Sequence, residues 1–168
     1  DAAPGEILVA RNVANLVPRY EAGGGQHGAS AALEFAVRAL RVRHIVVLGH
    51  AFCGGIEAFA ANDGPLTESD FIGKWMSQIA PAADAIKTPK ADWEAYLHQL
   101  EFASVELSLK NLMTFPFVQA AVEKGFFADE GLDVELHAST AADRATLAVV
   151  DGRAQYGVSA SDLVYQRL

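Results

Sequence analysis

The stretch "HIVVLGHAFCGGI", residues 44–56, decides how the chain is interpreted. Its first half is a β-branched apolar run without alternation, which is typical of a strand buried on both faces of a parallel sheet. The run ends at Gly49, and His50, Cys53 and a Gly-Gly pair follow before a helical pattern begins. Ligand sites of open α/β sheets lie at the carboxyl ends of strands. The stretch therefore predicts a sheet and a site beside it.

His50 and Cys53 form an H-x-x-C pair whose side chains can reach one ion across a tight turn. Imidazole and thiolate are preferred ligands of Zn²⁺, and a catalytic zinc takes three protein ligands and leaves one position open. Cys53 is the only cysteine of the chain. The pair predicts an incomplete zinc site; the alternative is that Cys53 is a small buried hydrophobe.

The rest of the chain alternates between strand and helix patterns. We expect strands at residues 6–11, 44–49, 131–139 and 154–162. Helical patterns cover residues 29–40, 53–61, 70–86 with a break near Pro81, 91–114, 116–124 and 140–152. In the long helix, Trp93, Leu97 and Leu100 share one face, as do Val105, Leu109 and Leu112. This order predicts a three-layer α/β domain with a largely parallel sheet.

Composition excludes several classes of function. The 168 residues are about one domain's worth, and the net charge of −8 argues against nucleic acid as a partner. Arg38, Arg41 and Arg43 are better interpreted as charge complementarity at a helix C-terminus. No apolar run reaches the roughly 18 residues of a membrane span, so no membrane association is expected. The expected location is the cytoplasm, with the periplasm as the alternative.

Residues 1 to about 124 resemble the bacterial β-class carbonic anhydrases. The matching pieces are "DAAPGEILVARNVANLVP", "GGQHGASAALEFAVRALRVRHIVVLGHAFCGGI", "FIGKWMSQIAP" and "LEFASVELSLKNLMTFPFVQAAVEKG". The resemblance implies a parallel sheet, obligate dimers, and a zinc held by Cys, His and Cys that hydrates CO₂ to bicarbonate. His50 and Cys53 match the second and third ligands.

The first cysteine of that family, with an Asp-Arg dyad, belongs to a C-x-D-x-R motif on the strand before "DAAPGE". The 168 residues begin after that motif. We therefore expect a sheet truncated at the N-terminus, doubtful zinc occupancy and impaired activity. An inactive structural chimera and a small-anion binding module are the alternatives.

From about Glu123 the chain resembles a different family. "EKGFFADEGLDVELHASTAADRATLAVVDGRAQYGVSASDL" resembles the early part of periplasmic substrate-binding proteins of nitrate, sulfonate, bicarbonate and thiamine-precursor transporters. We expect residues 125–168 to form a βαβ tail, packed into the same domain as a 1–124 core. One tail strand would fill the gap in the sheet, from the same chain or from a mate in a homodimer or higher oligomer.

Two residues of the tail are candidate additional zinc ligands. Asp162 aligns with the aspartate of the missing motif, and its alternative role is a helix N-cap, which Asp fills well. His137 lies on the first tail strand and would reach the ion if that strand packs beside His50.

Overall fold

The structure is a computed structural model that describes residues 5, 7–23, 25, 27–42, 44–62, 64 and 68–123. Almost all of these residues belong to one compact unit, Ala10–Val134, whereas Gly5 and residues 7–9 belong to a second. The predictions for residues 124–168 lie outside the described residues. These are the tail strands and helix, the packing of the tail, and the positions of His137 and Asp162.

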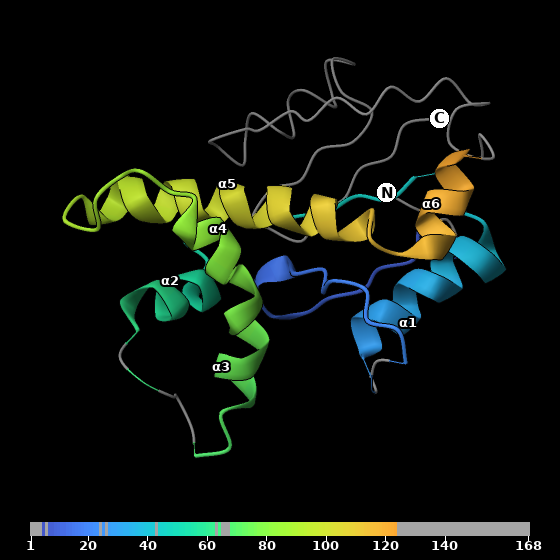
Figure 1. The fold of residues 1–168 in the computed structure, drawn as a ribbon, viewed down its shortest axis with the longest axis horizontal. Helices are drawn as coiled ribbons and strands as arrows, with labels where there is room; N and C mark the ends of the chain where they lie inside the picture. Colours follow the sequence, from blue (N-terminus) through green and yellow to red (C-terminus); the bar gives the residue numbers. More distant parts are fainter. Residues whose placement is uncertain are drawn as a thin grey trace. The chain divides into compact units, whose positions relative to one another are not determined.

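The regular elements of the described residues are helices, and irregular segments join them (Figure 1). The elements, in chain order, are η1 Val13–Asn15, α1 Gly28–Glu34, η2 Phe35–Leu40, α2 Gly54–Ala61, α3 Phe71–Met76, η3 Ser77–Ile79, α4 Ala80–Asp84, α5 Trp93–Leu112 and α6 Pro116–Glu123. The predicted helix at residues 29–40 is confirmed as α1 continuing into η2, a π-helical segment. The helices predicted after Cys53 and from Pro116 are confirmed as α2 and α6.

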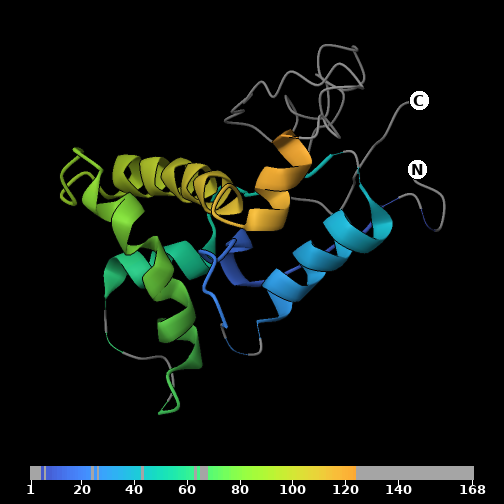
Figure 2. The same cartoon turned by 45° about the vertical axis from the view of Figure 1, so that its right-hand side comes forward.

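The predicted break near Pro81 is present, and it falls just before the proline. α3 ends at Met76, the short 3₁₀ segment η3 follows, and α4 begins at Ala80 (Figure 2). Pro81 lies in the first turn of α4. A missing N–H is harmless there, because the first N–H groups of a helix have no intrahelical acceptor.

α5 is the longest helix (Figure 1), and several of its residues belong to the core. The side chain of Asp92 caps its N-terminus and accepts a hydrogen bond from the N–H of Ala95 at 3.4 Å. The buried residues of α5 follow each other at intervals of four: Tyr96, Leu100, Ser104, Ser108 and Leu112. The predicted apolar face is therefore only partly correct, because two serines occupy the middle of the buried stripe and Trp93 and Leu97 lie at its edge.

The core forms where α5 meets α2 and α4, and it reaches η1 and η3. Ile56 of α2, Ile79 of η3 and Leu100 of α5 are almost completely buried in it. Cys53 belongs to the same cluster. The turn before α2 is thus anchored on one side in the core.

The strands predicted at residues 6–11 and 44–49 are not observed. Both runs have irregular backbone where the structure describes them, and none of the described residues is in a strand. A strand exists only as one side of a hydrogen-bonded ladder, and within the described part no ladder joins these runs to each other or to a third segment. Their apolar side chains are partly exposed, with 56% of Val46 and 40% of Leu48 accessible to solvent. The largely parallel sheet is therefore not observed in this part of the chain.

Candidate metal centre

The His50–Cys53 turn brings the chain from the irregular run into α2. Phe52 adopts φ 56°, in the left-handed region, and Cys53 follows as the N-cap residue of α2 with extended backbone. The Phe52 side chain is 87% exposed, so it does not anchor the turn. The Cys53 side chain, by contrast, is only 5% exposed. The turn thus has one buried sulfur and a strained, exposed residue beside it.

His50 is exposed, and its Nδ1 lies 2.8 Å from the carbonyl oxygen of Ala51. A carbonyl oxygen can only accept a hydrogen bond, so Nδ1 is the donor, and in the neutral form of the ring it is the nitrogen that carries the proton. Nε2 is then the nitrogen that carries the lone pair. A hydrogen bond of this kind fixes the tautomer of many metal-ligating histidines.

A carboxylate from α5 holds the backbone of Cys53. The N–H of Cys53 donates to Glu101 Oε1 at 3.0 Å, although the two residues lie 48 positions apart in the sequence. Glu101 is half-buried and follows Leu100 of the buried stripe. Sequence reasoning did not identify Glu101. The available signal was an acidic residue between Leu100 and Phe102, at the edge of the apolar face.

The glycines around the turn have different roles. A Cβ on Gly49 would lie 2.7 Å from Val105 Cγ2 of α5, and one on Gly55 would lie 3.2 Å from Val13 Cγ1. Both glycines therefore permit close packing. Gly54 has no atom within 4 Å of the equivalent position and is exposed. Of the Gly-Gly pair, only Gly54 leaves the backbone open beside the turn.

The η1 segment lies against Gly49 and Gly55 and is held from two helices. Ala14 and Asn15 have left-handed backbone, with φ 60° and 49°. Ser108 Oγ accepts from the N–H of Val17 at 3.1 Å and donates to the Asn15 carbonyl at 3.4 Å. Trp75 Nε1 donates to the Val13 carbonyl at 2.8 Å. These bonds keep the strained pair in place beside the turn.

The donor atoms fit zinc in kind and fall short in number. His50 offers an imidazole nitrogen and Cys53 a sulfur, both preferred by zinc. Within the described residues, no group of three His, Cys, Asp or Glu side chains is arranged to hold a metal ion. Any further protein ligand, including the predicted candidates Asp162 and His137, would come from outside that part.

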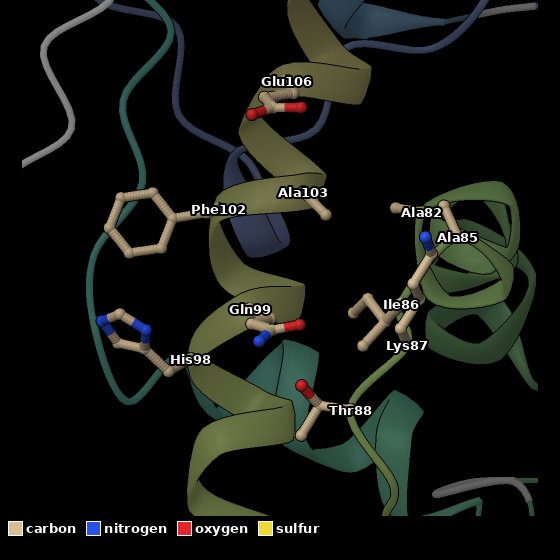
Figure 3. Close-up of a pocket in the computed structure, with 10 residues that line it drawn as sticks. All are labelled: Ala82, Ala85, Ile86, Lys87, Thr88, His98, Gln99, Phe102, Ala103 and Glu106. Carbon is tan, nitrogen blue, oxygen red and sulfur yellow. The ribbon is translucent and has the colours of Figure 1, made fainter.

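The other described histidines lie outside the turn in the sequence. His27 is exposed and precedes α1, and His44 is half-buried in the irregular run. His98 is exposed on α5, with its ring 4.9 Å from that of Phe102. It lines an open groove of about 680 Å³ between α4 and α5, together with Ile86, Thr88 and Glu106 (Figure 3). None of the turn residues lines this groove.

Comparison with known proteins supports both resemblances. The family model described as "Carbonic anhydrase" matches residues 1–138, and the model described as "NMT1/THI5 like" matches residues 113–168. The two matches overlap at residues 113–138, which include Glu123, the residue from which we expected the second family. The chain therefore has a C-terminal segment of the NMT1/THI5-like kind.

Curated relatives include two proteins of Arabidopsis thaliana. Beta carbonic anhydrase 3 is 38% identical over 132 residues, which are 76% of this chain and 50% of that protein. The chloroplastic beta carbonic anhydrase 5 is 34% identical over 130 residues, which are 76% of this chain and 42% of that protein. The chain spans about half the length of the curated relatives it matches.

Solved structures show the same relationship. The β-carbonic anhydrase CcaA matches with a TM-score of 0.60 at 22% identity, over 75% of this chain and 61% of that one. One of two tetrameric β-carbonic anhydrases of Sordaria macrospora matches with a TM-score of 0.57 at 29% identity, over 74% of this chain and 61% of that one.

In the part of the chain that the structure describes, no helix is long and apolar enough to cross a membrane. By the match to residues 1–138, the chain belongs to the β-carbonic anhydrase family.

Proposed function

We propose that His50 Nε2 and Cys53 Sγ are two of the protein ligands of a zinc ion that serves the hydration of CO₂ to bicarbonate. The observation that carries the proposal is the turn itself, with its sulfur buried at the start of α2 and its imidazole fixed through Nδ1. Burial of Cys53 is common to metal ligands and small core residues, so the assignment depends on the turn and the family. Zinc lowers the pKa of a bound water to about 7, which makes hydroxide available at neutral pH.

We also propose that the 168 residues by themselves catalyse this reaction weakly or not at all. They contain one cysteine, so they cannot complete the Cys-His-Cys ligand set that the resemblance implies. Metal binding depends on deprotonated ligands in a preformed site, so a missing thiolate lowers the affinity as well as the rate. The 168 residues also contain no C-x-D-x-R motif, and loss of residues that orient a metal site typically costs 10–100-fold.

The test is elemental analysis for zinc on the purified chain, with stopped-flow CO₂ hydration on the same samples. We expect substoichiometric zinc that His50→Ala and Cys53→Ser both remove, and little activity. His27→Ala, which changes an exposed histidine that precedes α1, is the matched control. Zinc retained in both turn variants would refute the site. Hydration at the rate of an efficient enzyme, abolished by Cys53→Ser, would refute the impairment.

For the organisation of the whole chain, we propose that residues 125–168 pack into one domain with the 1–124 core. The overlap of the two family matches supports this proposal, because residues 113–138 belong to both matches and leave no linker between them. Limited proteolysis tests it. We expect no stable fragment that ends near residue 124, and such a fragment would show that the two parts are separate domains.

A small-anion binding module is the second candidate function. The NMT1/THI5-like match over residues 113–168 favours it. Isothermal titration with bicarbonate or nitrate tests this candidate. Binding that survives Cys53→Ser would favour a module over a zinc enzyme, and no heat with either anion would exclude these two ligands. An inactive chimera would show neither zinc nor anion binding.

A further inference from the structure

The α2 helix is held at both ends by charged side chains of the sign that its dipole favours. At the N-terminal end, Glu101 Oε1 accepts the hydrogen bond from the N–H of Cys53. At the C-terminal end, Lys90 Nζ donates to the Ala60 carbonyl at 2.9 Å and lies 5.6 Å from the centre of the Tyr96 ring. A helix stabilises negative charge at its N-terminus and positive charge at its C-terminus. The two contacts are therefore matched, but only the first touches the turn.

The N–H of Cys53 needs an acceptor from elsewhere in the fold, because the first N–H groups of a helix have no intrahelical acceptor. In a capping box a Glu or Gln at the third helical position accepts this N–H, but that position of α2 is Ile56. A half-buried carboxylate makes a stronger hydrogen bond than a neutral acceptor. Glu101 thus fixes the backbone of Cys53. The sulfur is only two bonds from Cα, so its position follows that of the backbone.

We propose that Glu101 is a positioning residue, which holds the His50–Cys53 turn in the geometry that binds metal. The inference rests on the proposed function, because it assumes that the turn binds metal. The contact between Glu101 and Cys53 is observed independently. Phe52 has left-handed backbone and an exposed side chain, so the backbone relaxes at Phe52 when the Glu101 contact is removed, while the Cys53 side chain stays packed in the core. Relaxation at Phe52 changes the separation of His50 Nε2 and Cys53 Sγ.

Three variants distinguish the effect of the hydrogen-bond acceptor from that of its charge, and an effect on the turn from an effect on the whole of α2. Glu101→Ala removes the acceptor, whereas Glu101→Gln keeps an oxygen acceptor without the charge. Lys90→Met is the matched control, because it removes the contact at the other end of the same helix. The thermal midpoint of each variant of the full 168-residue chain shows how much each change destabilises the fold.

The first readout is a Co²⁺ titration followed by the thiolate-to-cobalt absorption band, with Cys53→Ser as the blank. Loss of a residue that orients a metal ligand typically weakens metal binding 10–100-fold, so we expect at least a ten-fold weakening in Glu101→Ala. We expect Glu101→Gln to recover most of the affinity and Lys90→Met to bind like the parent. Equal weakening by Glu101→Ala and Lys90→Met, with similar thermal midpoints, would reduce Glu101 to a structural role and overturn the proposal.

The second readout needs no metal. Because Cys53 is the only cysteine, a chain labelled with ¹⁵N-cysteine has one amide resonance. We expect its solvent exchange to be at least ten-fold faster in Glu101→Ala, and unchanged in Lys90→Met. Unchanged exchange in Glu101→Ala would overturn the proposal. If the parent chain shows no cobalt band, the proposed function fails, and the exchange rate still decides whether Glu101 holds the turn.

Discussion

At Gly49 the backbone passes so close to α5 that a single methyl group decides the packing. The Cβ of an alanine there would lie 2.7 Å from Val105 Cγ2 and 3.4 Å from both Oδ1 and Nδ2 of Asn15. A valine has few ways to move aside, because its χ1 is restricted. Gly49 also immediately precedes His50, so any shift of the backbone reaches the turn.

We expect Gly49→Ala to lower the free energy of unfolding by about 1–3 kcal/mol, the usual cost of overpacking. Urea denaturation followed by circular dichroism measures the change. Gly54→Ala is the control, because its Cβ meets no atom within 4 Å and alanine favours the helix that begins there. Equal stability of the two variants would contradict the close approach.

Phe52 stores backbone strain in the turn. A non-glycine residue in an unfavourable region costs of order 1–3 kcal/mol, and glycine removes this cost while adding entropy to the unfolded chain. We expect Phe52→Gly to raise the free energy of unfolding by about 0.5–1.5 kcal/mol.

The control for Phe52 is Phe71→Gly, which changes another exposed phenylalanine, 78% accessible, at the start of α3. Glycine disfavours a helix, so this variant should be less stable by up to about 1 kcal/mol. Thermal melts of both variants measure the change in stability. A loss of stability in both variants would contradict backbone strain at Phe52.

At the scale of elements, α5 organises the η1 segment through one of its two buried serines. Ser108 Oγ accepts from the N–H of Val17, two residues after η1, and donates to the carbonyl of Asn15, the last residue of η1. Asn111 adds a bond from its side-chain amide to the Val17 carbonyl at 2.8 Å. Ser104 instead donates to the Glu101 carbonyl within its own helix, at 2.8 Å.

The two serines should therefore respond differently to removal of the hydroxyl. We expect Ser108→Ala to cost about 1–3 kcal/mol, because it leaves a half-buried N–H without an acceptor. Ser104→Ala should cost under about 0.5 kcal/mol, because the Glu101 carbonyl remains within its helix and alanine is the better helix former. Urea midpoints of the two variants give the comparison, and similar losses would show that Ser108 does not hold η1.

Sequence reasoning placed the helices well and the strands poorly, for one physical reason. The hydrogen bonds of a helix join residues four apart, so periodicity and the proline near residue 81 were sufficient to locate α2, α4, α5 and α6. A strand needs a partner that the local sequence does not contain. The β-branched run at residues 44–49 has the composition of a strand, but no other described segment pairs with it.

At the scale of the whole molecule, large apolar side chains remain exposed in the described part of the chain. They include Phe35, Val46, Phe52 and Phe71, with 53%, 56%, 87% and 78% of their surface accessible. Apolar surface of this kind is commonly covered in an assembly. We expect the chain to form a homodimer or a higher oligomer at micromolar concentration. Light scattering coupled to size exclusion measures the mass, and a monomer would contradict this prediction.

The sequence by itself determined the family, the helices and the two candidate ligands, because motifs and helical periods are local features of the chain. Only the tertiary structure showed that the thiol of the pair is buried and the imidazole exposed. Only the tertiary structure joined Glu101 to Cys53 and Ser108 to the η1 segment. These contacts connect residues 48 and 91 positions apart, and a hydrogen bond over such a separation leaves no periodic pattern in the sequence. It exists only once the packing of α5 has brought the two partners together.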